Sequence, residues 1–532
     1  MTSAGAASAS TWAPLRSPMF RALWIAQFVS NLGTWMQTVG AQWMLVSDPG
    51  AAVLVPLVQT ATTLPVMLLA LPSGVLADLV DRRRLLLATQ GAMAAGVGLL
   101  ASLTGAGLTT PAVLLTLLFM IGCGQALTAP AWQAIQPDLV PPEQIPAAAA
   151  LGSMSMNGAR AIGPAIAGVL VSVAGPTSVF ALNAVSFVGI VIVLIAWRRP
   201  AVEQDYPPER ALAALSAGGR YIRRSPVVRR ILLRTALFIG PASALWGLLP
   251  VIASHQLGLS SAGYGLLLGA LGVGAVSGAF LLSRLRARYG QNALLTLGAG
   301  GFAVATAVLA LVHNFAAVLV ALVVGGASWL LSLATLNASM QLSLPAWVRA
   351  RGLSVYQLIF MGGQALGSVV WGVLAEATTS VISLLVSVAL LVGCAVSLLV
   401  LPLRKGTGKL DLRPSSHWPE PMLVIEPEPL DGPVLVLTSY RVLPENEENF
   451  IAAMTVLGRS RRRTGAAQWR LFRSVEQEST FVETFVVRSW GEHMHQHYTR
   501  LTGQDLIIEQ TVEKYIEGQP ESEHFLAVRD VR

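Results

Sequence analysis

The chain has 532 residues, of which 54% are hydrophobic and only 12% are charged, and its mean hydropathy is +0.61. A water-soluble domain carries about 25% charged residues. The composition therefore excludes an ordinary soluble enzyme, a disordered chain and a small disulfide-linked secreted domain. It indicates a protein that crosses a membrane several times.

Charge divides the chain into two parts. Residues 1–405 hold 22 Lys and Arg against 9 Asp and Glu, whereas residues 406–532 hold 14 against 19. We expect the first part to lie in the bilayer and the second in water. The excess positive charge lies between hydrophobic runs and does not indicate a nucleic-acid partner. Cys123 and Cys394 lie in apolar runs and predict no disulfide, and residues 1–19 lack the apolar core of a cleavable signal peptide.

Hydrophobic runs long enough to cross a bilayer recur from residue 20 to residue 402. A spanning helix needs about 20 mostly apolar residues. Twelve runs meet this length, near residues 20–46, 52–76, 84–105, 110–131, 148–172, 176–197, 230–254, 262–284, 291–312, 315–343, 350–374 and 379–402. Tight breaks such as Gly175-Pro176 separate several of them.

Lys and Arg are found in every second loop between these runs, and the loops in between have none. With twelve spans, all of their clusters fall on one side of the membrane, and the alternate loops carry none. The clusters are Arg16 and Arg21, Arg82 to Arg84, Arg198 through Arg234, Arg284 to Arg288, Arg349 and Arg351, and Arg404 and Lys405. Because positive loops stay in the cytoplasm, we expect both termini to be cytoplasmic, in a cell (inner) membrane.

The sequence repeats itself at a shift of 204 residues. The segment 158–170 falls on 362–374, and Gly74, Arg82 and Arg84 fall on Gly278, Arg286 and Arg288. Two segments in register at one shift argue against chance similarity. Two parallel six-helix repeats joined by a long basic loop are typical of a transporter whose halves rock about a central cavity.

A known family is recognisable from the loop at residues 74–84. The motif Gly74-Val-Leu-Ala-Asp78-Leu-Val-Asp81-Arg82-Arg83-Arg84 resembles the signature between helices 2 and 3 of the major facilitator superfamily, with Leu79 where Arg is common and Asp81 where Gly is common. The opening run at 24–37 and the tail resemble the transmembrane secretion effector branch, which is similar to the enterobactin exporter and to macrolide efflux proteins. The resemblance covers nearly the whole chain.

The resemblance implies a fold and a function. The predicted fold class is an all-α membrane protein of twelve transmembrane helices in two parallel six-helix repeats, followed by a small α+β domain. The implied activity is export of a bulky amphipathic siderophore, secondary metabolite or drug by alternating access, with protons as the coupling ion. The expected domains are 1–198 and 230–403 as six-helix bundles, 199–229 as the loop between them, 404–432 as a Pro-rich linker and 433–532 as a cytoplasmic domain.

The motif also implies a conformational latch. In the family this loop stabilises the outward-open state, and the resemblance places that role on Gly74, Asp78, Arg82 and Arg83. A carboxylate there pairs with a nearby guanidinium and faces the positive N-terminus of a neighbouring helix. The alternative is a solvated Asp before a positive loop.

Arg160 is the only Lys or Arg placed well within a hydrophobic run. An unpaired charge in a bilayer costs several kcal/mol, so Arg160 is expected to face the bundle interior or water. We predict that it binds an anionic or hydrogen-bonding group of the substrate; the alternative is a bond to backbone carbonyls. The other predicted substrate-binding residues, which lie at helical spacing, are Gln27, Asn31, Thr34, Asn157, Gln357 and Gln364.

Three features of the sequence bear on the energy source for transport. Gly163 and Pro164, with Gly168 beyond them, resemble the antiporter motif of drug–proton exchangers and predict a kink in the fifth run. No Asp or Glu lies deep in a run, although a proton antiporter normally needs an ionisable relay group. No phosphate-binding Gly-x-x-x-x-Gly-Lys-Ser/Thr loop is present, which argues against ATP hydrolysis, and no cofactor is expected.

The tail alternates between strand and helix patterns. Strands are expected near 434–442, 467–474, 480–489 and 524–529, with helices at 444–463 and 490–516. This order predicts a ferredoxin-like fold and resembles the dimeric α+β barrel of antibiotic-biosynthesis monooxygenases, which implies possible dimerisation. His493 and His497 are spaced to share a metal, but histidines on an exposed helix are commoner, and no metal is expected. Arg459 and Arg461 to Arg463 are expected to contact anionic lipid or to be solvated.

Two other functions remain open at this stage. One is an uptake permease of the same fold, because sequence does not set the direction of transport. The other is a membrane-tethered enzyme or sensor that acts through the tail. A catalytic tail is the less favoured of these, because its sequence offers no complete set of catalytic residues.

Overall fold

The computed structural model describes residues 12–197, 219–403, 415, 418, 423–425 and 427–528. They fall in two compact units. The first holds the described residues of 1–205, 234–336 and 356–402, and the second holds those of 206–233, 337–355 and 403–532.

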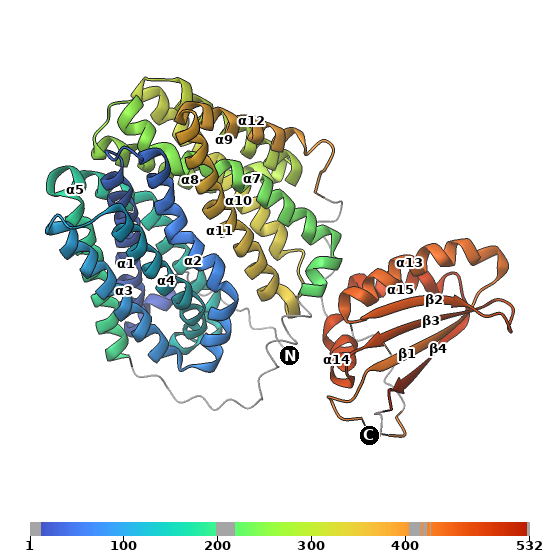
Figure 1. Ribbon diagram of the computed structural model, residues 1–532. Coiled ribbons are helices and arrows are strands. Elements are labelled where there is room, and N and C mark those ends of the chain that lie inside the picture. Colours follow the sequence, from blue (N-terminus) through green and yellow to red (C-terminus); the bar gives the residue numbers. More distant parts are fainter. Residues whose placement is uncertain are drawn as a thin grey trace, which may run out of the picture. The chain divides into compact units, whose positions relative to one another are not determined.

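Long helices make up the first unit (Figure 1). The elements from the start of the chain to residue 396 are η1 (Ala13–Arg16), α1 (Pro18–Leu45), α2 (Ala51–Leu79), α3 (Arg82–Gly105), α4 (Pro111–Leu139), η2 (Pro142–Gln144), α5 (Ile145–Ala196), α7 (Pro226–Val251), η3 (Ile252–Gln256), α8 (Ser261–Arg288), α9 (Gln291–Leu311), α10 (Phe315–Gln341), α11 (Ala346–Ala377) and α12 (Ser380–Val396). Each hydrophobic run predicted above coincides with a helix or part of one. Within the described part of the chain, nine helices are long and apolar enough to cross a membrane.

Helix α5 covers two of the predicted runs. It runs from Ile145 to Ala196, but Gly175 adopts a non-helical φ of 73° and ψ of 170° within it. Only glycine takes such a conformation at little cost, and Pro176 follows at once. The break predicted at Gly175-Pro176 therefore exists as a sharp change of direction between two helical segments.

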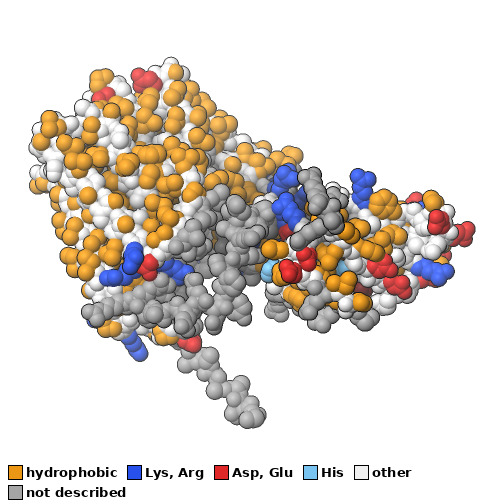
Figure 2. Space-filling model, turned by 60° about the horizontal axis from the view of Figure 1, so that its bottom comes forward, with side chains coloured by type: hydrophobic (Ala, Val, Ile, Leu, Met, Phe, Trp, Pro, Cys, Tyr) orange, Lys and Arg blue, Asp and Glu red, His pale blue; other side chains and the backbone are white. Residues whose placement is uncertain are grey.

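Large apolar side chains cover the outside of the helical unit (Figure 2). Val173 and Phe280, for example, are 82% and 78% exposed. A soluble monomer rarely exposes such a continuous apolar surface. The surface is suited to contact with lipid, and the chain is a multi-pass membrane protein.

Glycines bring the helices into close contact at positions related by 204 residues. A Cβ on Gly163 would lie 2.9 Å from Cβ of Trp35 in α1, and a Cβ on Gly367 would lie 2.9 Å from the carbonyl oxygen of Gly240 in α7. Similarly, Gly168 of α5 packs against α8, and Gly372 of α11 packs against α2. Gly163 and Gly367 each contact the first helix of their own half. Gly168 and Gly372 each contact the second helix of the other half.

Two arginines hold the ends of helices through backbone carbonyls. Arg83, at the start of α3, donates from Nε to the carbonyl oxygen of Leu194 (3.0 Å) and from a terminal nitrogen to that of Ile195 (2.8 Å). Arg234 in α7 donates to carbonyl oxygens of Cys394 (3.2 Å) and Ser397 (2.8 Å). Each guanidinium satisfies carbonyls that the end of a helix leaves without an intrahelical partner.

The second unit contains a four-stranded antiparallel sheet. Its elements are β1 (Val434–Arg441), η4 (Pro444–Asn446), α13 (Glu447–Thr464), β2 (Gln468–Arg473), β3 (Thr480–Val487), α14 (Trp490–His495), η5 (Gln496–Arg500), α15 (Gly503–Glu513) and β4 (Glu517–Leu526). The strand order is β2-β3-β1-β4. Residues pair as Val436 with Phe485 between β1 and β3, and as Val436 with His524 between β1 and β4.

A buried charge network fixes the helices to this sheet. Glu483 is fully buried and accepts hydrogen bonds from the hydroxyl of Tyr440 (2.7 Å), from Nε1 of Trp469 (2.7 Å) and from Nε of Arg461 (3.1 Å). Arg461 also pairs with Glu509. The predicted solvent or lipid contact of Arg461 is therefore wrong, because these two carboxylates hold its guanidinium inside the domain and raise its pKa despite burial.

Candidate functional site

Arg160 lies on α5 against the aromatic face of Trp35 in α1. The guanidinium carbon is 5.4 Å from the centre of the Trp35 ring. Its Nε is buried and has no hydrogen-bond partner within the part of the chain that the structure describes. A cation over an indole is stabilised by the ring quadrupole but keeps its N–H donors free. Among the described residues no group accepts from this Nε, so Arg160 is placed to donate to a bound molecule.

Polar contacts join α1 to α5 beside this arginine. Nε2 of Gln27 donates to Oδ1 of Asn31 (2.9 Å), and Nδ2 of Asn31 donates to Oγ of Ser155 (3.1 Å). Oε1 of Gln27 is buried without a partner. Trp24 also donates to the carbonyl oxygen of Leu151 (2.9 Å), so α1 and α5 share two hydrogen bonds in this region, at Leu151 and Ser155. Three of the residues predicted to bind substrate, Gln27, Asn31 and Arg160, therefore lie along one helix pair.

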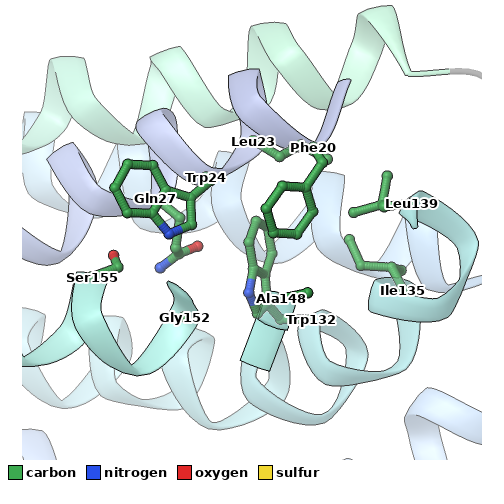
Figure 3. A pocket seen from close by; sticks show the side chains of 10 residues that line it. All are labelled: Phe20, Leu23, Trp24, Gln27, Trp132, Ile135, Leu139, Ala148, Gly152 and Ser155. Atoms are coloured by element: carbon green, nitrogen blue, oxygen red, sulfur yellow. The ribbon is translucent and has the colours of Figure 1, made fainter. Parts of the chain in front are cut away.

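A small pocket opens next to this network (Figure 3). Its cavity volume is about 30 Å³, which is room for about one water molecule. In Figure 3, the indoles of Trp24 and Trp132 and the side chains of Gln27 and Ser155 line it. Apolar walls with a few polar groups are typical of sites that bind small amphipathic molecules. The remaining lining residues are Phe20, Leu23, Ile135, Leu139, Ala148 and Gly152.

The other predicted binding residues are placed differently. Asn157 is exposed and donates to the carbonyl oxygen of Ser153 on its own helix (2.9 Å). The carbonyl oxygen of Thr34 accepts from the hydroxyl of Thr38 (3.0 Å). On α11, Gln357 is exposed, whereas Gln364 is buried at 8% exposure. The structure groups Gln27, Asn31 and Arg160, but gives no contact that joins the α11 pair to them.

The predicted latch is described only in part. Gly74 and Asp78 lie on α2, and their surroundings are outside the described residues. Asp81 is the N-cap of α3, where its Oδ1 accepts from the backbone N–H of Arg84 (2.9 Å). Arg83 binds the carbonyls of Leu194 and Ile195 as described above. For Arg83 the structure thus gives a definite function in holding α3 to the end of α5.

Hydrogen bonds between the two halves of the helical unit lie toward one end of the helices. We call this the neutral end, because it meets the loops without Lys or Arg, near residues 48, 107, 175, 255, 313 and 376; the opposite end is the positive end. The hydroxyl of Tyr264 donates to Oε1 of Gln42 (2.6 Å), and both side chains are buried. Oγ of Ser261 donates to the carbonyl oxygen of Gly168 (3.2 Å).

The hydrophobic clusters follow the same division. A large cluster combines residues of both halves, including Val46 of α1 and Ile252 of η3. Near the positive end, two smaller clusters draw only on residues before 198, among them Leu23 and Leu151. The contact of Tyr264 was not predictable from the sequence, because only the fold brings it to Gln42, 222 residues earlier in the chain.

Two histidines of the tail, His493 and His497, are buried rather than exposed. His493 is 1% exposed and His497 is 3% exposed, which corrects the expectation of an exposed histidine helix. The ring of His493 lies 4.9 Å from that of His524 and 5.5 Å from that of Trp490, centre to centre. Within the described residues, no group of three His, Cys, Asp or Glu side chains has a geometry that would hold a metal. The cluster arises because α14 and η5 pack His493 and His497 into the domain.

We expect the C-terminal domain to lose stability in mild acid because of His493. Burial, with smaller contributions from His524 and His497, lowers the pKa of His493 from 6.5 to about 3. Since the unfolded chain then binds a proton that the folded chain excludes, stability falls as the pH drops from about 6.5 toward 3, by about 1 kcal/mol at pH 5.5. Tryptophan fluorescence of the full chain during denaturation at pH 7.5 and 5.5 measures the change. A His493→Phe variant should lose much of this pH dependence, and an equal dependence in the variant contradicts the assignment.

The fold and this site define a class of protein. The chain is similar in structure to the nucleoside transporter NupG (TM-score 0.54, 13% identity, 73% of this chain and 100% of that chain). It is also similar to a bacterial homologue of the lysosomal transporter Spinster in an inward-facing, unoccupied conformation (TM-score 0.55, 15% identity, 73% and 96%). These likenesses show that the chain has the fold of these two proteins.

The sequence then identifies the family. Residues 9–531 match the transmembrane secretion effector family, and the chain belongs to it. It is 27% identical to the enterobactin exporter EntS of Salmonella typhimurium over 378 residues (70% of this chain, 89% of the exporter). It is also 25% identical to the staphyloferrin A transporter of Staphylococcus aureus over 266 residues (49% of this chain, 66% of that transporter). The protein is a secondary membrane transporter that works in export, and not an enzyme.

Proposed function

We propose that the protein exports a siderophore or a similar bulky, oxygen-rich amphipathic metabolite across the inner membrane. The observation that carries this proposal is Arg160, a cation within the helical unit that lies over Trp35 and has a buried donor without a partner. Carboxylate, hydroxamate or catecholate oxygens are acceptors for such a donor. The relatives named above, which handle enterobactin and staphyloferrin A, favour the same class of substrate.

The proposed mechanism is alternating access between two six-helix halves. We count twelve spans by treating the two segments of α5 as separate helices, with both termini and all positive loops in the cytoplasm. The contacts of Gly163 and Gly168, which recur at Gly367 and Gly372, support a repeat of this kind. The contacts between halves at the neutral end favour an arrangement that is closed outside and open to the cytoplasm. An exporter in this arrangement is ready to load substrate.

We propose the proton gradient as the energy source. The described carboxylates of the helical spans, Asp48 and Glu376, lie at helix ends and are not buried, so they do not provide an internal relay. Resemblance of Gly163-Pro164 to the antiporter motif supports the proposal. The latch of Gly74, Asp78, Arg82 and Arg83 and the substrate contacts of Thr34, Asn157, Gln357 and Gln364 belong to the same proposal.

The tail is proposed to be a ferredoxin-like domain in the cytoplasm. Its element order, strand, helix, two strands, helices and strand, supports this assignment. The proposed boundaries are 433–532 for this domain, 404–432 for the linker, 199–229 for the loop between halves, and 1–198 and 230–403 for the two bundles. We also propose that the domain can mediate dimerisation.

Comparison of metabolites in cells and medium tests the proposed export. A deletion strain and its complemented parent are grown in high and low iron, and a compound that accumulates only inside the deletion strain identifies the substrate. We then expect an uncoupler that collapses the proton gradient to stop its export from the complemented strain. Equal metabolite profiles and drug sensitivities contradict export, and favour an uptake permease or a function centred on the tail.

A further inference from the structure

Three segments that are far apart in the sequence meet in the second unit. Residues 219–224 form a helical turn just before α7, and Trp347 is the second residue of α11. Both contact the helices of the C-terminal domain. Within the second unit, the C-terminal domain therefore packs against the beginnings of α7 and α11.

An ion pair forms the first part of this docking interface. Glu492 of α14 binds Arg220, and it also accepts from Arg500 of η5 (3.1 Å). The side chains of Arg220 and Glu492 are 20% and 14% exposed, and that of Arg500 is 7% exposed. A buried carboxylate between two guanidiniums is held strongly, because loss of one partner leaves a desolvated charge.

Aromatic rings form the second part. The guanidinium of Arg500 lies 5.2 Å from the ring centre of Trp347, and Tyr221 meets the same ring edge-on at 5.5 Å. On its other side Tyr221 lies 5.8 Å from the guanidinium of Arg463, which is paired with the buried Asp505. Tyr221 is only 3% exposed. The four side chains thus form a row, Arg500, Trp347, Tyr221 and Arg463, in which residues of the domain enclose the two aromatic rings of the helix beginnings. Separation of the domain from the helix beginnings would break both outer contacts.

The helices that the domain holds are central to the proposed cycle. α11 carries Gln357 and Gln364, and its Gly372 packs against α2 of the other half. When the halves rock, α11 has to change its tilt relative to α2, and its beginning has to move. Because α7 and α11 belong to the same half, tying Trp347 to Arg220 does not oppose rocking of that half as a rigid body. It opposes bending of the beginning of α11 away from that of α7 and toward the other half. It therefore stabilises the arrangement present in this structure.

We propose that the C-terminal domain is a docked brake on the transport cycle, held to the beginnings of α7 and α11 by Arg220, Tyr221 and Trp347. This inference rests on the proposed function, since the arrangement that it stabilises is the one open to the cytoplasm. Release of the domain then allows the cytoplasmic side to close sooner and speeds export. The contact is an intramolecular control of transport, and the domain needs no catalytic activity for it.

Two single variants of the full chain test the brake from either side of the interface. Glu492→Gln removes the charge on the domain, and Trp347→Ala removes the ring at the beginning of α11. Hydrogen exchange of residues 219–224 reports docking, and export into inverted membrane vesicles, normalised to the amount of protein, reports transport. Glu447→Gln is the matched control, because it breaks the exposed pair of Glu447 with Arg473 elsewhere in the domain.

We expect both variants to exchange faster at 219–224 and to export at least threefold faster than the wild type, with no change in the control. Arg220→Lys, which keeps the positive charge opposite Glu492, should keep slow exchange and slow export. Release of the domain with unchanged or slower export overturns the brake. Slow exchange that persists in the combined Glu492→Gln and Trp347→Ala variant overturns the interface. A wild-type chain that does not export refutes the proposed function, whereas the exchange result still tests the docking.

Discussion

Replacement of Arg160 by Ala should lower export about 10- to 100-fold while the protein folds normally. The guanidinium has a buried Nε without a partner and lies over Trp35, so its unused donors are available to an anionic substrate. A hydrogen bond to a charged group contributes about 1.5–3 kcal/mol. Loss of that amount corresponds to the expected factor, since each 1.4 kcal/mol changes affinity about tenfold.

The measurement is the rate of export of the metabolite identified in the deletion strain, at several internal concentrations. Arg160→Lys should fall between the wild type and Arg160→Ala, because Lys keeps the charge but loses the planar fork and its stacking on the indole. Arg284→Ala is the control, since Arg284 is exposed at the end of α8. If Arg160→Ala exports an anionic substrate at the wild-type rate and affinity, Arg160 does not bind the substrate.

Much of the helical architecture was predictable from the sequence, because bilayer thickness limits the length of each apolar run. The predicted run at 84–105 corresponds to α3, and that at 291–312 corresponds to α9. Glycine and proline marked the change of direction inside α5. Contacts between helices were less accessible, because a polar residue such as Gln42 looks the same in sequence whether it lines a cavity or binds Tyr264 from the other half.

In the tail, pattern and packing disagreed at the last strand. A strand was expected at 524–529, whereas β4 begins at Glu517 and ends at Leu526. Most of β4 is polar and exposed, and it is held through backbone pairing with β1 at the edge of the sheet. Side-chain periodicity predicts a strand only where one face is buried, so such an edge strand leaves a weak signal. The burial of His493 was missed for a related reason, because it depends on how α14 packs into the domain and not on a pattern in the sequence.

Gly168→Leu should reduce export by at least tenfold because it prevents closure at the neutral end. A Cβ at this position would lie 2.5 Å from the carbonyl oxygen of Ser261 and 2.8 Å from Cα of Gly265. Both neighbours are backbone atoms of α8, so they cannot give way as a flexible side chain can. Helices α5 and α8 must then separate, and the hydrogen bond from Ser261 to Gly168 must break. The arrangement that loads substrate from the cytoplasm becomes inaccessible.

Two measurements separate this effect from simple misfolding. In a chain whose free Cys123 and Cys394 are replaced by Ser, a Val46→Cys reporter, placed where Val46 is 2% exposed at the neutral end, should resist a membrane-impermeant maleimide. The same reporter should react with it when Gly168→Leu is added. Gly189→Leu is the matched control, because a Cβ at Gly189 meets no atom within 4 Å. It should keep both the export and the protection of Val46→Cys. Wild-type export by Gly168→Leu would contradict this prediction. It would mean that substrate is loaded without close contact between α5 and α8.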